Sequence, residues 1–243
     1  MRMKGRLLIA GVAAVAALAL AGGGAYVYFF SGLRSSPSAL GLSSPTGRAS
    51  GNPTATTAGG LAGTWTVTTG SRAGYRVQEL FVGQTSKHEA VARTTNVSGS
   101  LTVSGDSNGY EVSKITLTAV LTDLHSEDSV AGRDVTQRDG FVARDMNLQQ
   151  FPNATFTASS ASVPGAVTSQ AVDVTVPGKL TIHGVTKDVT ATAKAQVTGG
   201  EIEIAGSLVI VMTDYGVSPP SVPFTTSDSQ VTIEFQLFLT RAS

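Results

Sequence analysis

The chain has 243 residues, no cysteine, and 17 basic against 17 acidic side chains. The absence of cysteine excludes a disulfide framework, a thiolate nucleophile, cysteine-ligated metal sites and a lipidated N-terminal cysteine. The even charge balance argues against a nucleic-acid-binding protein, which would carry a basic excess. The charge is unevenly distributed, because residues 1–60 hold five basic residues and no acid, whereas residues 61–243 hold 12 basic and 17 acidic residues.

The first 30 residues have the pattern of an export signal. Residues 1–6 form a basic leader, and residues 7–30 are uncharged. A helix of 24 residues would be about 36 Å long, enough to span a hydrocarbon core of about 30 Å. The pattern favours a signal anchor, a single transmembrane helix over 7–30 with its basic end in the cytoplasm. The domain would then lie outside the cytoplasmic membrane.

A cleaved signal peptide is the alternative interpretation of this segment. Ala19-Leu20-Ala21 has the small-x-small pattern that signal peptidase requires. Cleavage there would yield a secreted protein, so both interpretations predict export.

Residues 31–60 are expected to be a linker. Of these thirty residues, 24 are Ser, Gly, Pro, Thr or Ala. Such a segment buries too little apolar surface to offset the entropy of ordering. We therefore predict a disordered tether, either a spacer of set length or a simple connection, followed by one domain over 61–243.

The domain is predicted to consist almost entirely of strands, because apolar and polar residues alternate along it. The segment 123–150 lacks this alternation and is expected to hold a short helix. Turn signals occur at Asp106-Ser107-Asn108-Gly109, His183-Gly184 and Gly199-Gly200. The predicted strands are Thr64–Thr69, Tyr75–Val82, Val97–Val103, 114–122, Thr155–Ser160, Val174–Ile182, 189–198, Ile202–Met212 and 231–239.

One-sided alternation in successive hairpins fits either a β-sandwich or a closed up-and-down barrel. Consecutive hairpins favour the barrel, with eight or so antiparallel strands. The inward row Ala191, Ala193 and Ala195 is small, which predicts an apolar cavity. Alternatively, large side chains such as Phe156 and Phe235 fill the interior.

No catalytic residue, metal site or cofactor is predicted. Gly105-Asp106-Ser107-Asn108-Gly109 matches a nucleophile pattern, but that elbow needs a helix after it, and here a hairpin is expected. His88, His125 and His183 lack the spacing of metal ligands. Arg133, Arg138 and Arg144 are each followed by Asp, and each could either pair with a nearby acid or bind a phosphate.

Residues 65–240 resemble the YceI-like family of polyisoprenoid-binding, lipocalin-like barrels. Four segments carry the resemblance: Trp65-Thr66-Val67 with Tyr75-Arg76-Val77, Phe151-Pro152-Asn153-Ala154-Thr155-Phe156, Gly178–Lys187, and Asp214-Tyr215-Gly216-Val217. The resemblance implies an antiparallel barrel around an isoprenoid tail and no catalysis. This chain has Glu79 where the family often has histidine.

The resemblance also suggests candidate site residues. The family's Arg-Asp pair matches Arg138-Asp139 best, with Arg133-Asp134 and Arg144-Asp145 as alternative registers. We expect Arg138 or Arg133 to contact a polar head group, and Asp139 to orient Arg138. The expected partners are an isoprenoid lipid, either a quinone or a prenyl phosphate, and the cytoplasmic membrane. The alternative function is a structural or adhesive envelope domain with a filled core. The candidate cavity lining is Trp65, Leu117, Phe156, Ala191, Ala193, Ala195, Leu208 and Phe235.

Overall fold

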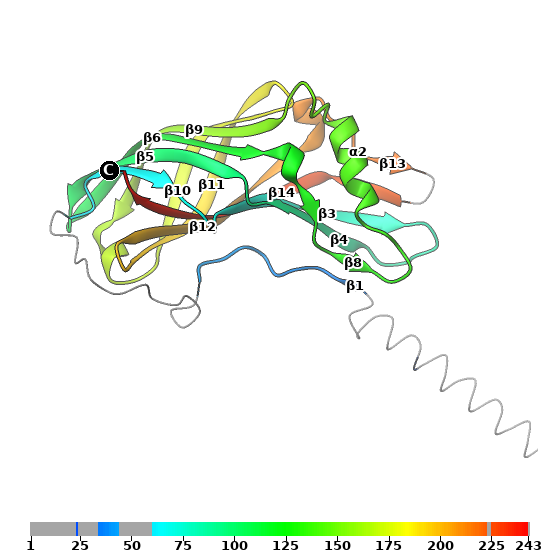
Figure 1. The fold of residues 1–243 in the computed structure, drawn as a ribbon, viewed down its shortest axis with the longest axis horizontal. Coiled ribbons are helices and arrows are strands. Elements are labelled where there is room, and N and C mark those ends of the chain that lie inside the picture. Colours follow the sequence, from blue (N-terminus) through cyan, green and yellow to red (C-terminus); the bar gives the residue numbers. More distant parts are fainter. Residues whose placement is uncertain (1–22, 24–33, 44–59, 223–224, 243) are drawn as a thin grey trace, which may run out of the picture.

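The computed structural model describes residues 23, 34–43, 60–222 and 225–242. It is an antiparallel β-barrel with one short α-helix at one end (Figure 1). The strands are β1 (Arg34–Ser35), β2 (Gly63–Val67), β3 (Arg72–Phe81), β4 (His88–Thr94), β5 (Val97–Asp106), β6 (Gly109–Val120), β7 (His125–Ser126), β8 (Ser129–Val130), β9 (Asn153–Pro164), β10 (Val172–Ile182), β11 (Val185–Thr198), β12 (Glu201–Val211), β13 (Ser221–Val222) and β14 (Thr225–Arg241). The helices are η1 (Leu121–Asp123), α2 (Gln137–Asp145), η2 (Gly165–Thr168) and η3 (Met212–Tyr215).

Eight strands close the barrel in the order β2, β5, β6, β9, β10, β11, β12 and β14, with β14 returning to β2. The 17-residue β14 pairs with β12 along one edge. Along its other edge it pairs first with β3 and then with β2. This closure confirms the barrel and excludes the sandwich.

The predicted strands are confirmed where alternation is strong, as on β11, where Ala191, Ala193 and Ala195 are buried between exposed neighbours. The prediction missed β4, because six of its seven residues are buried and the strand therefore shows no alternation. The short helix expected within 123–150 is α2.

Trp65 anchors the core at the end of the barrel away from α2. Its side chain is fully buried with Leu101, Leu239 and neighbouring strand residues. Its indole N–H donates to the Leu61 carbonyl at 2.9 Å. This end is therefore closed by packed side chains.

Gly178 explains how two of the family-like segments meet. It lies on β10, beside Phe156 of β9. A Cβ at Gly178 would lie 2.5 Å from Cζ of Phe156, so the ring lies over a backbone that has no side chain. The absence of a side chain at position 178 therefore fixes the position of an aromatic ring in the barrel wall.

Residues 34–43, called the strap below, cross the outside of the barrel (Figure 1). The strap begins at β1, which pairs with β8 through Arg34 and Val130. It then crosses β4, β3 and β14, and it reaches Glu203 of β12 through the Ser43 amide at 2.7 Å. These residues fall within the predicted disordered linker, and that expectation is wrong over 34–43.

The strap lies over charged side chains that the alternation pattern placed in solvent. Glu234 on the outer face of β14 is only 2% exposed. Arg76 and Arg93 each donate to it at 2.8 Å, and the Leu40 amide of the strap donates at 3.0 Å. Gly74 lies between Arg93 and Glu234 in the sheet, and a Cβ there would overlap the Arg93 side chain. The outer face is therefore a covered polar surface here.

The predicted membrane anchor over 7–30 falls almost entirely outside the described residues. Within the described part of the chain, the structure has no helix of sufficient length and apolar character to cross a membrane.

Candidate functional site

A cavity of about 420 Å³ opens at the α2 end of the barrel. This outer chamber lies within the range of about 300–1,000 Å³ typical of small-molecule pockets. Phe141 and Val142 of α2 and Met146, which directly follows the helix, line one side, and Ile210, Val231 and Ile233 line the barrel side. Exposed Gly132, Arg133 and Asp134 also line it, so the chamber reaches solvent there. We call this opening the mouth.

A second cavity of about 150 Å³ continues deeper into the barrel. The two cavities share Ala73, Ala119, Ala154, Leu180 and Ile233 as lining residues, so they form one passage. The side chains of this inner chamber are apolar apart from that of Thr118, since the Glu234 carboxylate lies on the outer face of β14. The passage thus changes from a partly polar mouth to an apolar interior.

Seven of the eight predicted lining residues line the inner chamber: Leu117, Phe156, Ala191, Ala193, Ala195, Leu208 and Phe235. Trp65 lies elsewhere, in the packed core beyond the inner chamber, because its strand β2 belongs to the closed end. The contact of the seven residues with a ligand stays a prediction.

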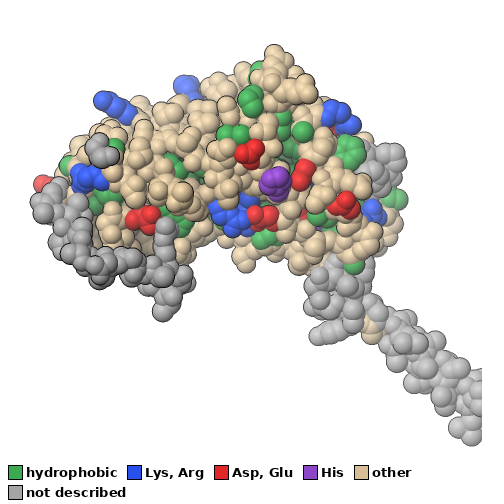
Figure 2. Space-filling model, in the orientation of Figure 1, with side chains coloured by type: hydrophobic (Ala, Val, Ile, Leu, Met, Phe, Trp, Pro, Cys, Tyr) green, Lys and Arg blue, Asp and Glu red, His purple; other side chains and the backbone are tan. Residues whose placement is uncertain are grey.

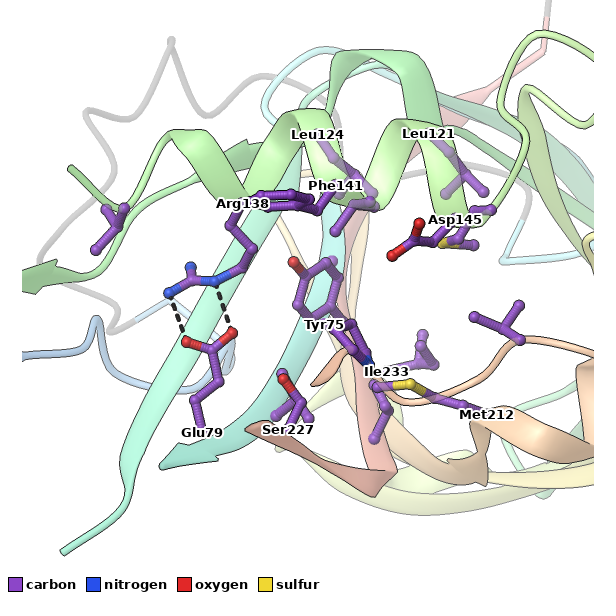
Figure 3. A pocket seen from close by; sticks show the side chains of 18 of the residues that line it. Tyr75, Glu79, Leu121, Leu124, Arg138, Phe141, Asp145, Met212, Ser227 and Ile233 are labelled. Carbon is purple, nitrogen blue, oxygen red and sulfur yellow. Dashed lines mark hydrogen bonds and ion pairs between the residues drawn. The ribbon is translucent and has the colours of Figure 1, made fainter. Parts of the chain in front are cut away.

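Two tyrosine hydroxyls in the outer chamber were not among the predicted site residues. Tyr75 and Tyr215 both line it, and each has a buried hydroxyl without a hydrogen-bond partner among the described residues. In Figure 3, Tyr75 lies between α2 and Ile233. Burial raises the pKa of both phenols, and the charge of Asp214 adds to the effect at Tyr215. Both hydroxyls therefore stay protonated at neutral pH and can donate a hydrogen bond.

Arg138 lines the outer chamber, but its donors are used within the protein. Nε and Nη2 donate to the two carboxylate oxygens of Glu79 at 2.9 and 3.0 Å (Figure 3). Nη1 and Nη2 donate to Asp128 at 2.7 and 3.1 Å, and Nη1 also donates to the Ser126 hydroxyl at 3.0 Å. An arginine has five N–H donors, so none remains for a ligand. The sequence-based prediction that Arg138 holds a head group therefore conflicts with this geometry.

Asp128 is the second acid of this network and is itself buried. Burial alone would raise the pKa of its carboxyl group. The hydrogen bonds from His88, Arg138 and the Val91 amide outweigh burial and hold the pKa well below its ordinary value. Asp128 is therefore ionised at neutral pH, and its charge is matched by Arg138.

Arg133, the alternative head-group residue, is placed differently. It is exposed at the mouth, and its guanidinium lies 4.4 Å from the ring centroid of Phe81. Its neighbour Asp134 accepts hydrogen bonds from the Thr136 amide and hydroxyl instead. Arg133 is thus better placed than Arg138 to meet a ligand at the mouth.

The sequence-based hypothesis expected Asp139 to orient Arg138. In the described structure the two side chains are connected only through Ser126. The Asp139 carboxylate accepts from the Ser126 amide and hydroxyl, at 3.1 and 2.7 Å for the shorter contacts. Ser126 is also a partner of Arg138. Asp139 therefore acts on the β7 backbone, which in turn holds the arginine.

His183 links three family-like segments around Tyr215. It occupies the turn between β10 and β11 with a φ of 53°. The ring of Phe151 meets it edge-on at 5.0 Å, and its Nδ1 lies 3.1 Å from the Tyr215 carbonyl oxygen. Gly216 follows at a φ of 72°, which ends η3. Motifs far apart in the sequence thus fix the position of one cavity tyrosine.

The other chemistry suggested by sequence motifs has no support in the geometry. Ser107 lies in the hairpin turn between β5 and β6, where the Asn108 amide donates to Asp106 at 2.8 Å. No group of three or more acidic or histidine residues in the described segments could hold a metal ion.

A family model described as the YceI-like domain matches residues 65–239. The chain belongs to this family. No curated protein matches it. Among solved structures, a polyisoprenoid-binding domain from Saccharophagus degradans, implicated in plant cell wall breakdown, is 16% identical with a TM-score of 0.50, over 74% of this chain and 99% of that one. BcnA of Burkholderia cenocepacia is 20% identical with a TM-score of 0.45, over 68% and 95% of the two chains. At 16% identity the likeness to the Saccharophagus degradans domain supports the fold alone.

Proposed function

We propose that this YceI-like protein is a membrane-attached, extracytoplasmic binding protein for an isoprenoid lipid. The observation that carries the proposal is the two-part passage, in which an apolar inner chamber adjoins an outer chamber with two tyrosine hydroxyls that have no partner among the described residues. An isoprenoid has the same two parts, a long apolar tail and a small oxygen-bearing head. The polyisoprenoid-binding relative from Saccharophagus degradans supports the same ligand class.

The charges around the outer chamber favour an uncharged head. Its lining includes three acids, Glu79, Asp134 and Asp145, and two bases, Arg133 and Arg138. Arg138 and Glu79 pair with each other, and Asp145 pairs with Arg144. Arg133 is offset by its neighbour Asp134, so a phosphate would meet no excess of positive charge. A quinone carbonyl or a prenol hydroxyl could instead accept hydrogen bonds from Tyr75 and Tyr215. We therefore place a neutral head between these tyrosines and the tail in the inner chamber.

The direct test is mass spectrometry of lipids extracted from the purified full chain. A variant with the inner chamber filled, Ala193→Phe, separates lipid in the cavity from lipid carried by the membrane segment. An isoprenoid enriched in wild type and depleted in the variant is the expected result. Equal lipid content in both proteins would contradict the proposal and favour a structural domain without a ligand.

The nature of the head is tested separately by titration with geranylgeraniol and geranylgeranyl phosphate, which share one tail. Tighter binding of the alcohol is expected. Tighter binding of the phosphate would contradict the neutral head and point to Arg133.

A further inference from the structure

The strap determines which end of the barrel can face the membrane. Arg34, its first residue, hydrogen-bonds Ser86 and Gln84 in the β3–β4 hairpin and pairs with Val130 of β8. Val130 also forms a bridge with Arg133, which lines the mouth. The strap therefore starts beside the mouth of the cavity and runs away from it along the outside of the barrel (Figure 1).

The start of the strap leaves little chain between the barrel and the apolar run. Only three residues separate Phe30, the last residue of that run, from Arg34. Fully extended, this connection spans about 14 Å. If residues 7–30 lie in the bilayer, the mouth is held close to its surface, whereas a free linker of thirty residues would leave the barrel unoriented.

Exposed apolar side chains also mark the mouth end of the barrel as the end that faces the membrane. In the described residues, three large hydrophobic side chains are exposed: Val82, Val209 and Val211. Val82 directly follows Phe81, and Val211 directly precedes Met212, and both of these neighbours line the outer chamber. Acidic and basic side chains lie side by side at this end (Figure 2), so contact there does not depend on anionic lipid.

From these observations we infer that the strap is an orienting device, which holds the mouth of the cavity against the outer surface of the membrane that carries residues 7–30. The surface around the mouth then contacts the lipid bilayer. An isoprenoid can pass between the bilayer and the cavity without crossing water. The inference rests on the proposed membrane attachment.

The strap is suited to this role because it is held by buried polar contacts at several points. Arg76 and Arg93 donate to the Pro37 and Ser38 carbonyls, while Leu40 and Ser43 donate to Glu234 and Glu203. Contacts on four neighbouring strands fix both the position and the direction of the strap. A single contact would let the chain pivot.

The natural absence of cysteine allows a clean test with single labels. The full chain is reconstituted in phosphatidylcholine vesicles that carry a quencher on the lipid head group. A fluorophore is attached at Val82→Cys beside the mouth or, as the matched control, at Asn108→Cys in the turn at the opposite end. The length of the barrel can be judged from β11, whose 14 residues span about 46 Å along the strand. Labels at opposite ends of the barrel therefore lie at different distances from the bilayer. Strong quenching at position 82 and little at position 108 is expected.

An insertion then tests the strap itself. Ten Gly/Ser residues between Leu33 and Arg34 add a root-mean-square span of about 18 Å before the strap. This insertion should abolish the difference between the two labels. The same insertion between Thr46 and Gly47, after the strap, should leave the difference intact.

Each contrary result has a distinct meaning. Equal quenching of the two labels in the unmodified chain overturns the orientation. An insertion before Arg34 without effect, or one after Thr46 that abolishes the difference, overturns the role of the strap. Failure of the chain to associate with vesicles overturns the membrane attachment and this inference with it. Lipid extraction from the same samples reports on isoprenoid binding independently.

Discussion

Glu79 and Arg138 form a two-pronged ion pair inside the mouth, with Nε and Nη2 of the arginine 2.9 and 3.0 Å from the two carboxylate oxygens. Glu79 replaces the histidine often found at this position in the family that the sequence resembles. The acid gives Arg138 a fixed partner, and the pair connects β3 to α2. The arginine that looked like a ligand contact is therefore part of the attachment of the helix that covers the cavity.

Arg138→Lys should consequently lower stability more than ligand affinity. Lysine keeps the charge but cannot donate to Glu79, Asp128 and Ser126 in the same fork. Hydrogen bonds to charged groups contribute about 1.5–3 kcal/mol each, so a loss of about 3 kcal/mol in the free energy of unfolding is expected in urea denaturation. Arg144→Lys is the control and should change stability by less than about 1 kcal/mol, because Arg144 is exposed and its contacts in the described structure are a surface ion pair with Asp145 and the Phe141 ring. Unchanged stability with weakened binding would restore Arg138 as a ligand contact.

Tyr75→Phe and Tyr215→Phe should weaken the binding of an oxygen-bearing isoprenoid without destabilising the protein. Each removes a buried hydroxyl that has no partner in the described structure, so no protein hydrogen bond is lost. A hydrogen bond of about 0.5–1.5 kcal/mol corresponds to a two- to tenfold loss of affinity for geranylgeraniol. Squalene, an isoprenoid hydrocarbon, should bind wild type and variants equally. Unchanged affinity for the alcohol would place the head group elsewhere.

Ala193→Phe should reduce lipid occupancy more than it reduces stability. Ala193 lines the inner chamber, where a ring would take the space of the tail. If the interior were filled, the same change would overpack it and cost about 1–3 kcal/mol. Thr192→Phe places the same ring on the exposed face of the same strand and is the control. Calorimetric melting and lipid extraction on the three proteins separate the two outcomes.

Gly74→Ala should loosen the strap. The new methyl group would overlap the Ala92 carbonyl oxygen and the Arg93 side chain, displacing the guanidinium from Glu234. Hydrogen exchange should then accelerate at the Leu40 amide, which donates to the same carboxylate. Gly140→Ala is the control, because a Cβ there meets no atom within 4 Å. Equal protection of Leu40 in both variants would mean that the strap does not depend on this pair.

Acidification should release the strap. Burial would raise the pKa of Glu234, but the Leu40 amide, Arg76 and Arg93 outweigh it and lower that pKa. Burial likewise opposes, but does not prevent, the lowering of the Glu203 pKa by Gln236, Ser43 and Gln196. A depressed carboxyl pKa contributes stability that is present above the unfolded value, here 4.5, and is lost as pH falls through the folded value.

The measurement is the protection of the Leu40 and Ser43 amides against hydrogen exchange, corrected for intrinsic rates. Protection should be constant from pH 7 to about pH 5 and decline at lower pH. Glu234→Gln, which keeps the shape but not the charge, should show reduced protection of Leu40 even at pH 7. A decline with rising pH instead would contradict the assignment of these carboxylates.

The sequence by itself determined the barrel and most of its interior. Alternation has a period of two, and an uninterrupted apolar face can only be buried by closing or stacking the sheet, so the inward row from Ala191 to Ala195 was identifiable without coordinates. The sequence did not reveal β4, because both faces of this strand are covered and its residues therefore do not alternate between apolar and polar.

Only the tertiary structure decided which polar groups have hydrogen-bond partners within the protein and which do not. Four of the five donors of Arg138 meet acids from β3 and from the segment before β8, and the fifth meets the Ser126 hydroxyl of β7. No spacing in the sequence encodes this meeting of distant segments. Tyr75 and Tyr215 are candidates only because their buried hydroxyls have no partner within the described part of the structure. Likewise, residues 34–43 have the composition of a linker, yet their backbone groups are held by Arg76, Arg93 and Glu234. Composition predicts how much apolar surface a segment can bury, but not whether distant charged side chains will bind its backbone.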